Sequence, residues 1–181
     1  MSILYDERVD GALPVVDRAA VLSELRALLP ALQILHEAEE LRPYECDGLS
    51  MYRTTPMLVV LPDTVEQVQT LLKFAWGRDI PVVARGAGTG LSGGALPLEK
   101  GILLVMARFN RILSMDSDAG MATVQPGVRN LAISQAAAPH GLYYAPDPSS
   151  QIACSIGGNV AENAGGVHCL KYGLTVHNIH Q

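Results

Sequence analysis

The spacing of its glycines constrains this chain more than any other feature of the sequence. Nine of its 17 glycines fall in two short windows, five of them in residues 86–94 and four in residues 157–166. Glycine adopts positive φ angles, lets a ligand approach the backbone closely and allows successive N–H groups to converge on an anion. The sequence therefore predicts two glycine-rich sites.

Short apolar runs predict the strands around these windows. We expect strands at residues 58–61, 80–84, 101–107 and 121–125, each bounded by glycine, proline or polar residues. The first glycine window lies between the second and third of these strands. Buried β structure therefore brackets it.

Apolar residues at spacings of three and four predict three helices. The first runs from a cap at Asp17 to a stop at Pro30, the second covers residues 65–76 after a capping-box signature, and the third covers residues 128–140. Residues 115–120 form a polar turn before the last strand. Because strands and helices alternate irregularly, the pattern favours the α+β class over a regular doubly wound sheet.

The composition is that of a globular protein and excludes several functions. The chain has 181 residues, 49% apolar and 17% charged, which allows one domain or two small ones. Thirteen Lys and Arg against eighteen Asp and Glu give a net charge of −5 with no basic run, so nucleic acid is not expected as a partner. The longest apolar run, residues 102–107, is too short to span a membrane, and residues 1–10 do not read as a secretory signal. We expect a cytoplasmic protein without a transmembrane segment.

The first window does not fit two common nucleotide-binding loops. Residues 88–93 read Gly-x-Gly-x-x-Gly, but Pro97 and a strand from Gly101 leave only about six residues where a Rossmann unit requires a crossover helix. In the P-loop frame, Gly94 and Ala95 stand where Lys and Ser or Thr are required. A pyrophosphate bound mainly by backbone amides remains, with a glycine-rich surface turn as the alternative.

The second window belongs to a longer stretch of small and polar residues, and from here on the name second window refers to that whole stretch, residues 146–166. Residues 146–166 read PDPSSQIACSIGGNVAENAGG and combine hydroxyl and amide side chains with two Gly-Gly pairs. Such a surface can lie flat against a large planar ligand and offer hydrogen bonds to its polar edge. A close-packed helix and turn, in which the small residues serve only chain approach, is an equal alternative.

The order of these motifs, PxxVVxP, helix, PVVARGAGTGLSGG, VQPGV and the second window, is specific. It resembles the FAD-binding domain of the vanillyl-alcohol oxidase and p-cresol methylhydroxylase (PCMH) superfamily, and within it the family of FAD-containing D subunits of bacterial glycolate oxidases, close kin of D-lactate dehydrogenases. The resemblance runs from Met1 to about Asn178. It includes two unusual segments, residues 44–48 and 166–173.

The resemblance implies a fold and a division into domains. The fold is an α+β, PCMH-type FAD-binding domain of two small α+β subdomains, incomplete at its C-terminal end. Residues 1–41 are expected to form an N-terminal helical appendage. Residues 42–181 are expected to form the FAD-binding domain, without the substrate-binding domain that follows it in relatives.

The resemblance also implies which residues contact FAD. Residues 85–91 match the pyrophosphate loop and residues 92–94 complete its turn, whereas residues 146–150 match the stretch that runs beside the flavin. Residues 154–159 match the segment that contacts the ribityl chain and pyrophosphate, and Asn163 with Gly165 match the next contact. The positions carried over are Arg85, Gly86, Ala87, Gly88, Thr89, Gly90, Leu91, Ser92, Gly93, Gly94, Pro146, Asp147, Ser149, Ser150, Cys154, Ser155, Gly157, Gly158, Asn159, Asn163 and Gly165. Some members of the superfamily tether FAD through a histidine in the first loop. Since no histidine occurs in residues 85–94, non-covalent FAD is expected.

For the complete enzyme, the resemblance implies oxidation of a small 2-hydroxy acid, such as glycolate to glyoxylate, with hydride transfer to flavin N5. The 181-residue chain alone is expected to be an inactive fragment of that enzyme. A D-lactate dehydrogenase of the same superfamily, or a flavin-binding module without catalysis, is the alternative. Expected partners are the 2-hydroxy acid, an iron–sulfur subunit and a second flavin subunit, with possible peripheral attachment to the inner membrane through those subunits. No catalytic residue is identified, because relatives supply the proton acceptor from the substrate-binding domain.

The cysteines and histidines do not indicate a metal site. Three cysteines, Cys46, Cys154 and Cys169, lack the spacing of a zinc or iron–sulfur ligand set, and the five histidines are scattered. We expect reduced thiols and no metal. Cys154 is interpreted as a small packed residue near the flavin, because it has no neighbouring base in the sequence.

Overall fold

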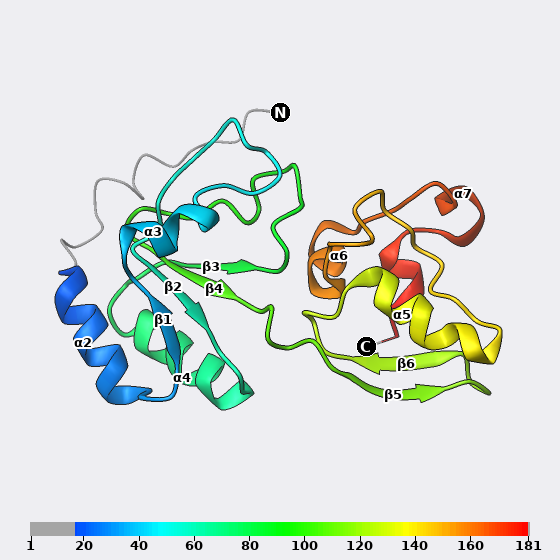
Figure 1. Ribbon diagram of the computed structural model, residues 1–181, viewed down its shortest axis with the longest axis horizontal. Coiled ribbons are helices and arrows are strands. Elements are labelled where there is room, and N and C mark those ends of the chain that lie inside the picture. The colour runs from blue at the N-terminus through cyan, green and yellow to red at the C-terminus, as the bar shows by residue number, and fades with distance from the viewer. Residues whose placement is uncertain (1–16, 181) are drawn as a thin grey trace.

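The computed structural model describes residues 17–180, which form two lobes (Figure 1). The stretch between β4 and β5 connects them, and the chain does not return to the first lobe. Strands and helices are mixed in both lobes, which confirms the α+β class. The prediction that residues 1–10 are not a secretory signal lies outside the described residues. So do the first 16 residues of the predicted N-terminal appendage and the last residue, Gln181, of the predicted FAD-binding domain.

The first lobe is built on a four-stranded sheet with the order β1-β2-β4-β3. β2, β4 and β3 run parallel, whereas β1 is antiparallel to β2. These strands are β1 (Gln33–Leu35), β2 (Leu58–Leu61), β3 (Val82–Arg85) and β4 (Ile102–Val105). β3 is an edge strand, and the first glycine window leaves from its carboxyl end.

Helices cover both faces of this sheet. α2 (Arg18–Leu28) and α4 (Val65–Trp76) lie on one face, and α3 (Ala38–Leu41) lies on the other, followed by the 3-10 turn η1 (Arg42–Tyr44) (Figure 1). Alternate side chains of β2 and β4 divide between the two faces, as the pleat requires. One core contains Leu58, Leu71 and Ile102, and the other contains Leu41, Val59 and Leu103.

One half of the predicted capping box is present at the start of α4. The Thr64 side chain, at the N-cap, accepts a hydrogen bond from the Gln67 backbone N–H at 3.3 Å. The Gln67 side chain accepts a hydrogen bond at 2.7 Å from the backbone N–H of Asp63, one residue before the cap, and not from that of Thr64. The helix ends at Trp76, where Gly77 is the cap, so the predicted bounds of this helix are confirmed.

The second lobe combines a two-stranded antiparallel sheet with short helices. Its core contains Val128, Ile133 and Ile156, against which Ala122 and Val124 of the sheet pack. Its elements are β5 (Ile112–Asp116), β6 (Met121–Val124), α5 (Asn130–Ala137), η2 (Ala138–His140), α6 (Ile156–Glu162), α7 (Cys169–Tyr172) and η3 (Thr175–Asn178).

The structure differs from the sequence prediction in several elements. β1, β5, α3 and α7 were not predicted, and the strand expected from residue 80 begins at Val82. α6 lies in the stretch for which a close-packed helix and turn was one of two alternatives. The polar turn predicted over residues 115–120 was placed too early, because Met115 and Asp116 still pair with β6. The helix predicted over residues 128–140 is an α-helix only from Asn130 to Ala137.

The segment before residue 41 packs onto the first lobe. Val21 and Leu25 of α2 are buried in the same core as Leu58 and Leu71, and β1 extends the sheet beside β2. The described residues of this segment therefore share the packing of the sheet. The division of the chain at residue 41 stays a prediction.

Candidate functional site

The first glycine window forms an irregular loop rich in free hydrogen-bond donors. It follows β3, and Gly88 and Gly93 have φ angles of 68° and 78°, which favour glycine. Within the part of the chain that the structure describes, none of the ten backbone N–H groups of residues 86–95 donates a backbone hydrogen bond. Such donors are normally satisfied by protein, water or ligand. The loop can therefore offer a set of N–H groups to an anion.

Arg85 anchors this loop from within the protein. Its guanidinium is buried and donates to the carbonyl oxygen of Cys46 at 2.7 Å and to that of Ala95 at 3.5 Å. Burial lowers the pKa of Arg85, while Cys46 and Asp47 act in the opposite direction. If Gly88 carried a side chain, its Cβ would overlap the Arg85 guanidinium, so the backbone of the loop packs directly on that group. In this structure, two of the donors of Arg85 are used within the protein.

Residues 44–48 support the same loop. A Cβ added to Gly48 would lie 2.7 Å from the carbonyl oxygens of both Thr89 and Gly90, so the backbone of Gly48 packs closely against the loop. The ring centroid of Tyr44 lies 5.8 Å from the guanidinium carbon of Arg85. Asp47 is buried, and its Oδ1 accepts from the Leu49 N–H at 2.8 Å. The sequence marks this segment as unusual but gives it no role. Its role in the structure is to carry the glycine loop.

The second glycine window meets the first at the junction of the lobes. A Cβ at Gly86 would overlap Ser155 Oγ and would lie 3.8 Å from the backbone nitrogen of Gly158. Ser92 Oγ donates to Glu162 Oε1 at 2.7 Å. The structure therefore brings together residues from the two predicted sites that lie 70 positions apart. Glu162 was not among the predicted site residues.

Two buried polar atoms of the second window have no partner among the described residues. They are Ser155 Oγ and Asn159 Nδ2, on side chains that are 4% and 3% exposed. A buried polar group without a hydrogen bond is costly, and such groups are commonly satisfied by water or a ligand. Both residues were predicted to contact the cofactor. The unpaired atoms fit that prediction.

A cavity of about 620 Å³ opens beside this junction. Its lining combines the first loop, the connection between the lobes, α5 and the start of the second window, as Gly86, Ala87, Ala107, Asn110, Ile112, Gly127, Val128, Arg129, Leu131, Ala132, Gln135, Ile152, Ala153 and Ser155. Its volume lies in the range usual for ligand pockets. Gly86, Ala87 and Ser155 were predicted, whereas the residues of α5 and Gly127 were missed, although Gly127 belongs to the VQPGV motif.

The other predicted residues of the second window are held within the second lobe. The Pro146 carbonyl accepts from Asn130 Nδ2 at 2.9 Å, and the buried Cys154 donates its N–H to the Ser150 carbonyl at 2.8 Å. Gly157 lies against Pro126, and Asn163, with a φ angle of 48°, ends α6. Ser149 lies in the turn before Ser150, and Gly165 lies against Leu174. Their contact with a cofactor stays a prediction.

Asp147 joins the second window to the segment before α7. Its Oδ2 lies 2.6 Å from His168 Nδ1, and its Oδ1 accepts from the His168 N–H at 3.3 Å. The hydrogen bond from the His168 side chain lowers the pKa of Asp147, and burial opposes this. A Cβ at Gly166 would overlap the Asp147 carboxylate and carbonyl, so this turn packs closely. Gly166 was not predicted.

We expect His168→Ala to raise the pKa of Asp147 toward its ordinary value of about 3.9. Because the pKa is lowered in the folded chain, ionised Asp147 stabilises the fold above about pH 4, and this contribution is lost as pH falls through the lowered pKa. A titration of the Asp147 carboxyl ¹³C signal measures the shift. His140→Ala, which removes an exposed histidine elsewhere, is the control. An unchanged Asp147 pKa in His168→Ala would show that the pair does not set it.

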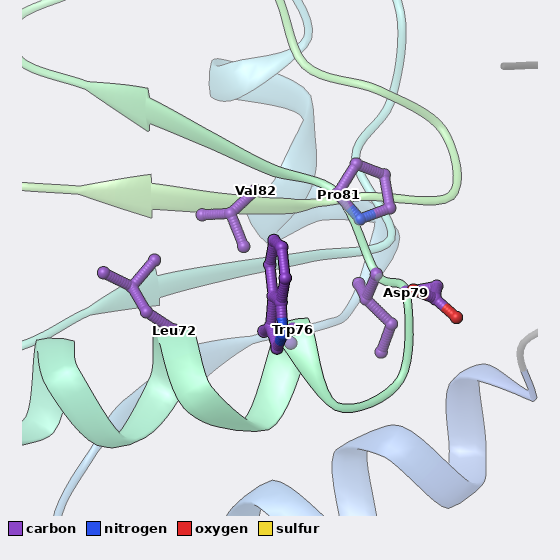
Figure 2. Close-up of a pocket in the computed structure, with 7 residues that line it drawn as sticks. Leu72, Trp76, Asp79, Pro81 and Val82 are labelled. Atoms are coloured by element: carbon purple, nitrogen blue, oxygen red, sulfur yellow. The ribbon is translucent and has the colours of Figure 1, made fainter.

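A second cavity, of about 500 Å³, lies between the end of α4 and the start of β3 (Figure 2). Its lining is mainly apolar, with Leu72, Trp76, Pro81 and Val82 around it, and Asp79 is its charged residue. Trp76 is 87% exposed. An anion in this cavity would meet the like charge of Asp79 and few hydrogen-bond donors, whereas the junction of the lobes has the free N–H groups of the first loop. The junction is therefore the better candidate for binding a phosphate-bearing ligand.

Residues 17–180 contain neither a candidate metal site nor a helix that could cross a membrane. No group of three or more His, Cys, Asp or Glu side chains there could hold a metal ion. None of the described helices is both long and apolar enough to cross a membrane.

Comparison with known proteins identifies the family. The model of the family described as "FAD binding domain" matches residues 56–181. The chain belongs to this family. The resemblance read from the motifs is thereby confirmed, and the family makes FAD the cofactor to be tested against the site.

Curated relatives of this FAD binding domain are subunits or enzymes of greater length. The chain is 73% identical over 179 residues to glycolate oxidase subunit GlcD of Escherichia coli K12, covering 99% of this chain and 36% of that protein. It is 46% identical over 116 residues to D-lactate dehydrogenase of Archaeoglobus fulgidus, covering 64% of this chain and 26% of the enzyme. The chain thus spans between about a quarter and a third of the length of these relatives.

Solved structures share the fold of this FAD binding domain. Alkyldihydroxyacetonephosphate synthase matches with a TM-score of 0.76 at 23% identity, over 88% of this chain and 32% of that one. p-Cresol methylhydroxylase with bound substrate matches with a TM-score of 0.68 at 23% identity, over 81% of this chain and 29% of that one. The predicted PCMH-type fold is confirmed.

Proposed function

We propose that this chain is the FAD-binding part of a flavin-dependent 2-hydroxy-acid dehydrogenase that oxidises glycolate to glyoxylate. The observation that carries the proposal is the 73% identity to glycolate oxidase subunit GlcD along nearly the whole chain. The geometry of the lobe junction supports it, since free backbone donors, a cavity and two unpaired buried polar atoms lie there together.

The residues present fit FAD. Backbone N–H groups of residues 86–95 would hold the diphosphate, which suits an acidic protein because dipoles rather than net charge do the binding. Ser155 and Asn159 would bind polar atoms of the ribityl chain and pyrophosphate, and residues 146–150 would run beside the ring system. When bound, FAD would supply the hydride acceptor for the 2-hydroxy acid.

The contribution of this chain is binding and orientation. Arg85 and residues 44–48 hold the first loop in shape, and Asn130 holds the carbonyl of Pro146 at the start of the second stretch. The core of each lobe fixes one of the two glycine windows. Apolar side chains that line the cavity, such as Ile112 and Leu131, would exclude water from a bound ligand. The proton acceptor for the substrate hydroxyl is assigned to the part of the relatives that this chain does not cover.

The proposed partners follow from the subunit named in the comparison. We propose assembly with an iron–sulfur subunit and a second flavin subunit, and a cytoplasmic location with peripheral attachment to the inner membrane through them. Identity to a protein that is itself a glycolate oxidase subunit supports assembly of this kind. The substrate remains a small 2-hydroxy acid, with D-lactate as the alternative to glycolate because a D-lactate dehydrogenase is also related.

We expect the 181-residue chain to bind FAD without a covalent bond. Residues 85–94 contain no histidine that could tether the flavin. After incubation with FAD and gel filtration, heat or acid should release intact FAD into the supernatant. Flavin that stays with the denatured chain would contradict non-covalent binding.

A chimera tests the catalytic part of the same proposal. The segment of the E. coli subunit that matches this chain is replaced by residues 1–181 and the chimera is loaded with FAD. Glycolate should then bleach the visible flavin absorbance. A chimera that binds FAD but is not reduced by any 2-hydroxy acid would favour a flavin-binding module without catalysis.

A further inference from the structure

Glu162 places a carboxylate on the first glycine loop. It is the last residue of α6 in the second lobe, and its Oε1 accepts the Ser92 hydroxyl hydrogen at 2.7 Å across the junction. A Cβ built on Gly94 would lie 2.9 Å from Oε1, and one built on Gly90 would lie 3.6 Å from it. The carboxylate therefore binds the Ser92 hydroxyl and lies close to the loop on the side of Gly90 and Gly94.

The charge of this carboxylate is not balanced by an ion pair. None of the ion pairs in residues 17–180 includes Glu162. Arg85, the cation nearest in sequence to the loop, directs donors to the carbonyls of Cys46 and Ala95. A negative charge thus lies against a loop whose backbone donors are suited to another negative charge.

We propose that Glu162 sets the affinity and selectivity of this loop by opposing phosphate-bearing ligands. Like charges within a Debye length, about 8–10 Å at ordinary salt, repel each other, and added salt weakens the repulsion. The backbone donors attract the diphosphate of a dinucleotide, and the carboxylate lowers the net gain. A flavin without phosphate does not experience this opposition. The inference rests on the proposed function only in taking the loop as the site of a diphosphate.

The test compares Glu162→Gln with the unaltered 181-residue chain. Glutamine keeps the shape of the side chain and an oxygen that can accept from Ser92, and removes the charge. Because Glu162 is exposed and its charge is screened by solvent, at low salt we expect Glu162→Gln to bind FAD and ADP about three-fold more tightly, and riboflavin and adenosine unchanged. The gain should shrink as sodium chloride is raised. Fluorescence titration for the flavins and calorimetry for ADP and adenosine measure the affinities.

Two further variants show whether the effect comes from the charge at position 162, from the contact of its side chain with Ser92, or from the net charge of the chain. Glu162→Asp keeps the charge and should give no gain in affinity. Asp118→Asn, in the exposed turn between β5 and β6, removes one negative charge as Glu162→Gln does and should also give no gain. An equal or weaker affinity of Glu162→Gln for FAD and ADP overturns the proposal, as does an equal gain in Asp118→Asn.

The ADP measurements distinguish failure of this inference from failure of the proposed function. If the chain binds ADP more tightly after Glu162→Gln but never binds FAD, the proposed flavin function fails and the role of Glu162 stands. If FAD binds and Glu162→Gln changes nothing, only the role of Glu162 fails. If neither ligand binds any variant, in the 181-residue chain and in the chimera with the E. coli subunit alike, the loop is not a phosphate site and both are overturned.

Discussion

Gly127→Ala should abolish FAD binding and lower the melting temperature by about 10 °C. A Cβ there would overlap the carbonyl oxygen of Met106 and would lie 2.8 Å from that of Phe109, both in the connection between the lobes. Because these are backbone atoms, they cannot rotate away as a side-chain end could. Overpacking of this kind costs about 3 kcal/mol, which corresponds to several degrees for a domain of this size.

In free energy, Gly127→Ala should weaken FAD binding by more than it lowers the stability of the fold. Gly127 lines the cavity at the junction, and its N–H donates to the Phe109 carbonyl at 2.7 Å, so displacement there moves one lobe against the other. Thermal unfolding and FAD titration measure the two effects. Gly77→Ala is the matched control, because its Cβ would meet the Lys73 carbonyl at an ordinary 3.5 Å. Wild-type FAD affinity in Gly127→Ala would show that the close packing of Gly127 against the Met106 and Phe109 carbonyls is not needed for binding.

The elements that could be predicted are those whose signal is local. β2, β4 and α4 each combine an apolar pattern with clear end signals within a dozen residues. β1 has three residues and depends on pairing with β2, which lies more than twenty positions away. β5 was missed because Ser114 and Asp116 make it look polar, and a register shift between Ile112 and Ser114 breaks its alternation.

The candidate site was predictable to a similar extent. The glycine pattern of residues 86–94 indicates a loop that can hold an anion, since that property depends on residues next to one another. Its supports depend on tertiary approach. The contact between Arg85 and Cys46 joins positions 39 apart, and the contact between Ser92 and Glu162 joins positions 70 apart. Nothing in the spacing of either pair marks it in the sequence.

Arg85→Met should weaken FAD binding at least 100-fold and destabilise the fold by about 3 kcal/mol. Removal of the guanidinium leaves the partly buried carbonyls of Cys46 and Ala95 without that donor, and each buried acceptor that loses its partner costs about 1–3 kcal/mol. The loop also loses the group over which Gly88 folds. Urea unfolding and FAD titration measure the two losses.

Asp47 gives this prediction a second, more specific test. Its Oδ2 is buried and has no hydrogen-bond partner among the described residues, and its charge acts on Arg85. When the arginine is removed, that carboxylate stays buried without its cation. Asp47→Asn should therefore make the loss in Arg85→Met smaller, so that the double variant is more stable than the sum of the single changes predicts. Arg42→Met, which removes an exposed arginine two residues before the supporting segment 44–48, should leave stability and FAD affinity unchanged. Additive losses would show that Arg85 acts through the two carbonyls alone.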